Sequence, residues 1–390
     1  MRVVGMISGT SMDGIDVAVA DLEIVGDAIH LRPLGATSQE YPAALRAALG
    51  AVLPPAWTTA EEVCRLDTLV GQAFAEAAVA ADREFGDGAI DLVVSHGQTI
   101  FHWVDADGRA RGGVQLGQPA WIAEATGAPV IADLRARDIA AGGHGAPLAS
   151  TLDELLLAES DETVAALNLG GIANITVVAN NAPTLAFDVG PANALIDAAV
   201  AEATGGAELF DRDGVRGRRG QIHAALLERL LADPYYRRSP PKSTGKELFH
   251  AAYLSGHVAA IGTIAANDVV ATVTALTAIT VADACRGFGI RRLIVSGGGV
   301  DNPALMERLV GELPGVPVVR IDEYGIPSAA KEAYLFALLG FLTVHQLPGS
   351  VASATGARRP VVLGCLLPGR DGFPPISPPS TPPSRLVVRQ

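Results

Sequence analysis

Two segments of the chain repeat one order of positions: an apolar run, a turn rich in glycine, and a second apolar run. Residues 5–23 read GMISGTSMDGIDVAVADLE, and their alternation predicts two strands joined by a turn at residues 8–14. Residues 163–178 read TVAALNLGGIANITVV and predict strands at 163–169 and 174–178. Two such hairpins, one opening each half of the chain, indicate two domains of related architecture.

The first turn holds more glycines and hydroxyl groups than a hairpin needs to reverse the chain. One interpretation is an ordinary hairpin with a polar turn. The other is a phosphate-binding turn, in which backbone N–H groups and the hydroxyls of Ser8, Thr10 and Ser11 face an anion. The pattern alone leaves both interpretations open.

Elsewhere the pattern alternates strands with helices, which predicts an α/β fold. Strands are predicted at 92–95, 130–133 and 292–295, and helices at 119–126 and through 153–158. Gly127 is expected to end the helix at 119–126, and Asn302 is expected to cap a later helix whose first residue is Pro303. A further strand is predicted to end at Asp188, before a Gly-Pro turn and another helix.

The length of 390 residues favours two domains over a single core. We expect a first domain at 1–145, a second at 146–339, and a late helical segment at about 340–368 that packs back on the first. The segment 369–390 is dense in Pro and Ser and is predicted to be a disordered tail.

The composition narrows the class of protein. A net charge of −13 argues against nucleic acid as a partner bound through a general basic surface, and still permits a small anionic ligand. The three cysteines lack the spacing of a zinc site or a disulfide framework, and the N-terminal apolar run is short for a signal peptide. The apolar segment 269–284 is interrupted by four threonines and predicts a buried helix. We therefore expect a soluble cytoplasmic protein with no membrane partner.

Seven motifs occur in one order along residues 1–368: SGTSMDGID, SHGQT, ADLRARDIAAGGHGAPL, NLGGIANIT, FDVGPAN, PKSTGKE and VSGGGVDNP. Together they resemble the anhydro-N-acetylmuramic acid kinases, a family of the actin/Hsp70/hexokinase-like ATPase superfamily. The resemblance implies two ribonuclease-H-like domains flanking an ATP cleft. It also implies a reaction in which water opens a 1,6-anhydro amino sugar and O6 is phosphorylated, giving N-acetylmuramic acid 6-phosphate during peptidoglycan recycling. The chain has no GxxxxGK[ST] motif, so a Walker P-loop is not expected.

Asp188 is the candidate catalytic base, because a carboxylate at a strand end can lie on a cleft floor, and the matching family aspartate activates water. The alternative is an aspartate that caps the following helix. The resemblance implies ATP binding by two turns and a later glycine run: Gly9, Thr10, Ser11, Met12, Asp13, Gly14, Ile15, Asp16, Gly170, Gly171, Gly297, Gly298 and Gly299. Because Asp13 and Asp16 would repel a polyphosphate, we expect Mg²⁺ as a cofactor beside ATP, held mostly by water and phosphate oxygens.

The candidate sugar-binding residues are His96, Gln98, Arg135, Asp138 and Glu332. Arg135 could pair with the lactyl carboxylate of the sugar, and Arg137 competes for that role. A histidine at a strand end is more often structural than catalytic, so His96 can equally have a purely structural role. The chain departs from the family pattern at residues 328–331 and at His144, and these departures bear on the sugar contacts.

Two other functions stay open at this point. One is a conventional sugar kinase that acts on a free hydroxyl, since the hairpins and the glycine run are shared across the superfamily. The other is an ATP-gated binding protein without a sugar substrate. The sequence also leaves a homodimer open, with ATP, an anhydro amino sugar and water as the expected small-molecule partners.

Overall fold

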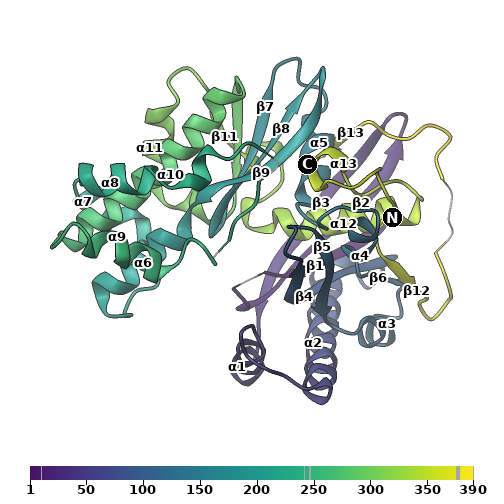
Figure 1. Cartoon of the computed structure of the whole chain (residues 1–390). Helices are drawn as coiled ribbons and strands as arrows, with labels where there is room; N and C mark the ends of the chain where they lie inside the picture. The colour runs from purple at the N-terminus through teal and green to yellow at the C-terminus, as the bar shows by residue number, and fades with distance from the viewer. Residues whose placement is uncertain (10, 241, 246, 375–377, 390) are drawn as a thin grey trace. The chain divides into compact units, whose positions relative to one another are not determined.

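The structure is a computed structural model that describes residues 1–9, 11–240, 242–245, 247–374 and 378–389. The chain divides into two compact units (Figure 1). The first unit combines Met1–Glu159 with Gly325–Gln390, and the second is Ser160–Tyr324. The first boundary therefore lies after residue 159 rather than 145, and the chain returns to the first unit at Gly325 rather than near residue 340.

The first unit is built on a mixed sheet, with the strand order β12-β6-β4-β1-β2-β3-β13 among the described residues and β5 paired to β4. Strands β1, β2 and β3 form an antiparallel meander, and β4 and β6 continue the sheet in parallel from β1. The strands are β1 (Arg2–Ser8), β2 (Gly14–Val25), β3 (Ala28–Glu40), β4 (Leu92–Val104), β5 (Ala110–Leu116), β6 (Val130–Ala132), β12 (Cys365–Leu367) and β13 (Arg385–Val388).

Helices cover both faces of this sheet. Alternate residues of β1 point to opposite faces, so its side chains contribute to the packing on both. Val4 and Met6 pack in a core with residues of α1, α2 and α3. On the other face lies α12, and a side chain at Gly5 would collide with its backbone at Ala333 and Ala337. The helices of this unit are α1 (Ala43–Ala51), α2 (Ala60–Ala81), the π-helix η1 (Asp82–Gly86), α3 (Pro119–Thr126), α4 (Ala136–Ala140), α5 (Ala149–Leu157), the 3₁₀-helix η6 (Ser328–Ala330), α12 (Lys331–Val344) and α13 (Ala352–Thr355).

The second unit has a five-stranded sheet among its described residues, in the order β11-β10-β7-β8-β9. Here too the first three strands form an antiparallel meander, and the last two run parallel to the first. The strands are β7 (Val164–Leu169), β8 (Ile172–Ala179), β9 (Ala182–Pro191), β10 (Arg292–Ser296) and β11 (Val318–Arg320). Both units thus share the ribonuclease-H-like path, with helices between the third and fourth strands and one helix before the fifth.

The long helix of the second unit is the buried one predicted from residues 269–284. It is long and apolar enough to cross a membrane by length and composition, yet 78% of that window is buried inside the unit. Four threonine hydroxyls donate to carbonyl oxygens of the preceding turn, which satisfies them within the core. The α-helices are α6 (Asn193–Thr204), α7 (Val215–Arg219), α8 (Ala224–Leu231), α9 (Ala251–Ala259), α10 (Ala266–Gly287) and α11 (Pro303–Glu312), and the 3₁₀-helices are η2 (Arg212–Gly214), η3 (Pro234–Arg237), η4 (Gly298–Asp301) and η5 (Ile321–Tyr324).

The C-terminal segment differs from the disordered tail that we predicted. Residues Arg385–Val388 form β13, which pairs in parallel with β3. Leu386 is buried, and Arg385 forms ion pairs with Asp27 and Glu159. The short apolar run after the prolines therefore covers the edge of the first sheet.

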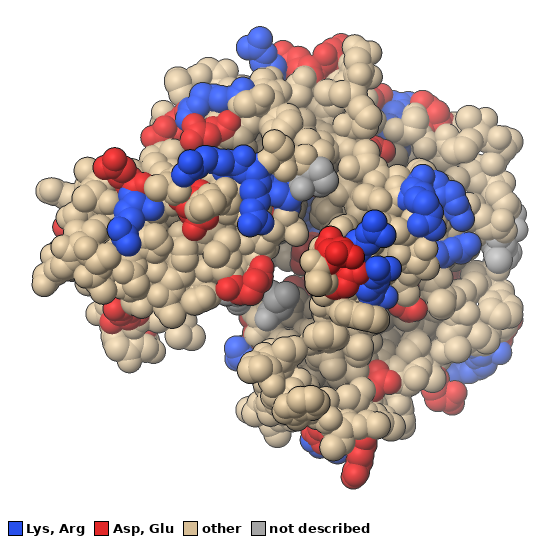
Figure 2. All heavy atoms as spheres, in the orientation of Figure 1, with Lys and Arg blue, Asp and Glu red and all other residues tan. Residues whose placement is uncertain are grey.

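The surface charges are mixed in sign on the face that Figure 2 shows. Acidic and basic side chains of the described residues alternate there with uncharged ones, and neither sign forms a continuous stripe on that face.

Candidate active site

The turn between β1 and β2 is held from inside the first unit. The Ser8 hydroxyl is buried, donates to the carbonyl oxygen of Gly14 at 2.7 Å, and lies 2.6 Å from Oε1 of Gln98. The Met12 side chain is buried, and its positive φ of 54° turns the chain back toward β2. Ile15 is fully buried. The side chains of Ser8, Met12 and Ile15 therefore support the turn, and from these three positions only the backbone remains to face a ligand.

The outer side of the turn is formed by Gly9, Ser11 and Asp13. A Cβ added at Gly9 would meet only the Ser11 hydroxyl, at 3.9 Å, so the space over Gly9 is open. A Cβ at Gly14 would lie 2.5 Å from the carbonyl oxygen of Gln39, so glycine is required there by the approach of β3. The exposed Ser11 hydroxyl donates to Oδ1 of Asp13 at 2.7 Å. Thr10 lies outside the described residues.

Asp16, at the start of β2, stands close to the charge of Asp13. Burial raises the pKa of Asp16, a hydrogen bond from Ser38 lowers it, and the negative charge of Asp13 raises it further. Among the residues that the structure describes, no group of three or more His, Cys, Asp or Glu side chains could hold a metal ion. The two carboxylates still offer the sparse oxygen ligands that Mg²⁺ uses when phosphate and water complete its shell.

Arg135 and His96 form a pair beside this turn, in the first unit. Nε of Arg135 donates to Nε2 of His96 at 2.8 Å, and Nη1 donates to the carbonyl oxygen of Gly145 at 2.5 Å. Burial, followed by the positive charge of Arg135, lowers the pKa of His96 well below its usual value. His96 is therefore a neutral acceptor that orients Arg135. Arg137 is exposed on α4.

Gln98 and Asp138 use their polar atoms inside the first unit. Gln98 is fully buried, and its amide nitrogen donates to the carbonyl oxygens of Gly9 and Thr99. Asp138 is also fully buried and accepts from the Gly145 N–H and the Thr355 hydroxyl, each at 2.8 Å. These contacts fix the turn and the loop after α4, so both side chains serve the framework around Arg135.

Glu332 and Lys331 begin α12, on the same unit. The Glu332 side chain is exposed to solvent at its edge, yet its carboxyl group is surrounded closely enough that burial raises its pKa. The positive charges of Arg135 and Lys331 lower this pKa, and the negative charge of Asp16 raises it further. Lys331 instead is buried, with Nζ 2.6 Å from Oδ1 of the buried Asp153. Of the five candidate sugar residues, Arg135 and Glu332 are thus the two whose charged groups can still contact a ligand.

Asp188 lies within β9, which continues to Pro191, and not at a strand end as we predicted. The register between β8 and β9 shifts beside it: Asn174 faces Asp188, whereas Ala173 faces Gly190. A bulge of this kind re-aims the side chains next to it. The following helix α6 is capped at Ala192 without a side-chain bond, which excludes the helix-cap interpretation of Asp188.

The Asp188 carboxylate is half-buried and bonded at both oxygens. Oδ1 accepts from the Asn174 amide nitrogen at 2.9 Å, and Oδ2 accepts from the Thr244 N–H at 2.9 Å. Burial raises the pKa of Asp188; these two bonds oppose it, while Glu247 raises and Lys242 lowers the pKa. Asn174, Thr244 and Lys242 were not predicted as site residues, although Asn174 lies in NLGGIANIT and the other two lie in PKSTGKE.

The glycines of the second unit divide into open and packed positions. The carbonyl oxygens of Gly170 and Gly171 accept from the first N–H groups of α6. Side chains at Gly297 and Gly299 would collide with Asn168 and Leu169 at the end of β7, whereas nothing lies within 4 Å of a Cβ at Gly298. Gly298 is therefore the member of this run that a ligand can approach most closely.

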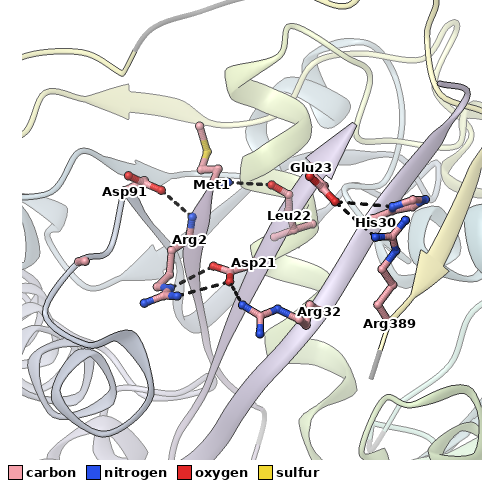
Figure 3. Close-up of a pocket in the computed structure, with 10 residues that line it drawn as sticks. Met1, Arg2, Asp21, Leu22, Glu23, His30, Arg32, Asp91 and Arg389 are labelled. Atoms are coloured by element: carbon pink, nitrogen blue, oxygen red, sulfur yellow. Dashed lines mark hydrogen bonds and ion pairs between the residues drawn. The ribbon is translucent and has the colours of Figure 1, made fainter. Parts of the chain in front are cut away.

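A separate pocket of about 570 Å³ lies in the first unit at the start of β1 (Figure 3). The turn of the candidate site follows the other end of this strand. Its charged side chains are already paired: Asp21 with Arg2 and Arg32, and Glu23 with His30 and Arg389. These pairs are an ion network on the sheet, and we assign no chemistry to this pocket.

Comparison with known proteins identifies the family. A sequence model of the anhydro-N-acetylmuramic acid kinase family matches residues 1–369. The anhydro-N-acetylmuramic acid kinase of Streptomyces coelicolor is 57% identical over 388 residues, covering 100% of this chain and 99% of the relative. The proteins of the same name from Streptomyces avermitilis, 57% identical over 96% of each chain, and Rhodococcus erythropolis, 52% identical over 98% of each chain, agree. The chain therefore belongs to the anhydro-N-acetylmuramic acid kinase family.

Proposed function

We propose that this chain uses ATP to phosphorylate anhydro-N-acetylmuramic acid, and that water opens the 1,6-anhydro bridge in the same reaction. The observation that carries the proposal is the match to named anhydro-N-acetylmuramic acid kinases over the full length of this chain. The match favours this reaction over a conventional sugar kinase and over an ATP-gated binding protein. The products are N-acetylmuramic acid 6-phosphate and ADP, as expected in cytoplasmic cell-wall recycling and amino-sugar catabolism.

The structure of the substrate dictates where the base acts. O6 of the anhydro bridge carries no proton, so a base cannot activate it as in an ordinary sugar kinase. In our proposal Asp188 takes a proton from water, and the water oxygen bonds to C1. The C1–O6 bond breaks, O6 bonds to the γ-phosphorus, and ADP leaves with the electrons of the broken phosphoanhydride bond. A pKa raised by burial makes Asp188 a stronger base than an exposed aspartate.

For ATP, we infer that the phosphates approach the open side of the first turn. The open space over Gly9 supports this, since backbone N–H groups there can approach an anion without steric cost. In the second unit, the open position at Gly298 supports an approach of the nucleotide to the glycine run. Gly170 and Gly171 remain proposed phosphate contacts beside the start of α6.

We propose Asp13 and Asp16 as the carboxylates nearest to Mg²⁺. Burial is the main cause of the raised pKa of Asp16, and the repulsion from Asp13, which adds to it, is the effect that a cation would relieve. When bound, Mg²⁺ would neutralise charge on the phosphates during transfer.

For the sugar, we propose Arg135 as the partner of the lactyl carboxylate, in preference to Arg137. Two N–H groups of Arg135 are used by His96 and Gly145, which fixes the guanidinium and leaves other N–H groups for a ligand. The carboxylate of Glu332, which interacts electrostatically with Arg135, is proposed to accept from sugar hydroxyl or amide groups.

The experiment that tests the reaction is turnover in ¹⁸O-labelled water, quenched before the free sugar exchanges its anomeric oxygen. We expect label at the C1 hydroxyl of the phosphorylated sugar and none in the phosphate. Label in the phosphate would indicate simple ATP hydrolysis. An unlabelled phosphorylated sugar would indicate an ordinary kinase, and either result would reject the coupled reaction.

A further inference from the structure

The carboxylate of Asp188 is held at each oxygen by a different part of the second unit. The donor to Oδ1 is the side chain of Asn174 on β8, and the donor to Oδ2 is the backbone N–H of Thr244, both at 2.9 Å. Asn174 is the cross-strand partner of Asp188 at the bulge. Two fixed donors, one on each oxygen, determine the plane of the carboxylate and leave the remaining lone pairs in fixed directions.

The backbone of Asp188 is fixed by the same surroundings. Its N–H donates to the carbonyl oxygen of Lys242 at 3.1 Å, and its carbonyl oxygen accepts from the Tyr235 hydroxyl at 2.7 Å. Residues 242–244 therefore bond to Asp188 through both its backbone and its side chain. They belong to the motif PKSTGKE, to which the proposed reaction assigns no part.

The charges near Asp188 come from this segment too. Lys242 lies with Nζ over the ring of Tyr235, 4.7 Å from its centroid. Its positive charge favours the ionised form of Asp188, whereas Glu247 opposes it. The phenol of Tyr235 stays neutral, because burial raises its pKa far above neutrality.

We propose that Asn174 and residues 242–244 are positioning groups, which hold Asp188 ionised and aimed at the attacking water. This inference rests on the proposed function, in which Asp188 is the base. A base must be held within hydrogen-bond reach of the proton that it removes. Donors fixed by a strand and by a bonded segment supply that geometry before the substrate binds.

The two hydrogen bonds to the Asp188 carboxylate determine in which direction its pKa moves when a donor is lost. Hydrogen bonds from Asn174 and Thr244 stabilise the charged form, so they hold the pKa of Asp188 below the value that burial alone would set. Loss of the Asn174 donor therefore raises this pKa. The base then stays protonated to a higher pH, and activity is lost on the acid side and recovers as the pH rises.

The test compares Asn174→Ala and Asn174→Asp with a matched control, Thr176→Val. Thr176 lies two residues along β8 and is fully buried, and its hydroxyl has no hydrogen-bond partner among the residues that the structure describes. We expect the acid limb of the kcat profile to move upward by about one pH unit in Asn174→Ala. It should move further in Asn174→Asp, because a second carboxylate replaces the donor. Thr176→Val should follow the native profile, and ATP affinity should stay unchanged in all three variants.

A loss of kcat by one factor at every pH, or an unshifted acid limb in both Asn174 variants, would overturn the proposal. A second readout does not depend on turnover: the Asp188 carboxyl, ¹³C-labelled and assigned by its absence in Asp188→Asn, is titrated by NMR. If the native protein fails to phosphorylate the sugar, the proposed function fails, while this titration still tests the positioning role. Should Asn174→Ala not fold, Asn174→Asp, which is close in shape, carries the same comparison.

Discussion

At the scale of single residues, the candidate site depends on partners that are distant in sequence. Asp188 was predicted as the base from its motif and from a strand end, whereas the structure places it inside β9, half-buried and bonded at both oxygens. Its donors were not predicted, because the register of β8 with β9 and the position of residue 244 are long-range features. Likewise, nothing in the local sequence indicated that Asp138 and Gln98 would use their polar atoms inside the unit.

The substitution Asp188→Asn removes the proton acceptor and keeps the shape of the side chain. We expect kcat to fall by roughly 10²-fold or more, the scale of general-base catalysis, with unchanged ATP affinity. Steady-state kinetics and calorimetric ATP titration measure the two effects. Since an amide offers one acceptor oxygen to the two donors, thermal unfolding serves as the control for the fold. Near-native turnover in a folded variant would contradict the role of Asp188.

At the scale of elements, boundaries set by local chemistry were predicted well. The helix α3 spans Pro119–Thr126 and ends at Gly127 with positive φ, and Asn302 caps α11 through its side chain, which confirms both predictions. Strand β4 was predicted to end at Ser95 and runs to Val104, because its later residues pair with β5. That extension is set by a partner strand and leaves no alternating pattern in the segment, whose last four residues are all exposed.

The two glycines in the turn between β1 and β2 are expected to have different roles, Gly9 in ATP binding and Gly14 in stability. In Gly9→Val the side chain enters open space, so we expect a folded protein with weaker ATP binding. In Gly14→Val the side chain would collide with the backbone of β3, so we expect loss of stability before any effect on the nucleotide. Calorimetric ATP titration and thermal unfolding distinguish the two. Unchanged ATP affinity in a folded Gly9→Val variant would contradict phosphate binding by this turn and would favour the ordinary-hairpin interpretation.

The start of α12 is fixed by the buried pair of Lys331 and Asp153. In Lys331→Met, the Asp153 carboxylate is left buried without a partner, and we expect the free energy of unfolding to fall by about 3–5 kcal/mol. The double variant Lys331→Met with Asp153→Leu should recover most of the stability, as chemical denaturation can measure. Equal losses in the single and double variants would show that the ion pair is not the cause.

At the scale of the whole molecule, the two sheets share the related architecture that the paired hairpins indicated, whereas the strand β13 was missed. A run of four residues, Arg385–Val388, carries too little periodicity to predict a strand, and its pairing with β3 spans most of the chain. The return of the chain to the first unit at Gly325 was also placed wrongly. The packing of α12 on β1 is a contact between residues far apart in the sequence, which local patterns do not reveal.

Deletion of residues 370–390 removes β13 and leaves β3 as an open edge. Burial of Leu386 alone contributes about 1.5–3 kcal/mol, so we expect a lower thermal midpoint. We expect kcat and ATP affinity at 25 °C to persist, because the candidate site residues all precede residue 333. Arg389→Ala, which removes a half-exposed side chain 3.8 Å from Glu23, is the control and should melt like the native protein. An unchanged midpoint after deletion would show that β13 does not stabilise the first unit.

The return of the chain to the first unit also dictates the order in which a ribosome can complete the protein. Strand β1 is made first, but α12, which covers the face of β1 at Gly5, begins only at Lys331. At typical synthesis rates the interval is roughly 16–65 s. The second unit is one continuous stretch with its own core, and it can fold while the first waits. Once β2, β3 and β4 have joined β1, and until α12 is made, we expect the nascent chain to present an uncovered apolar sheet face, the kind of surface that chaperones bind.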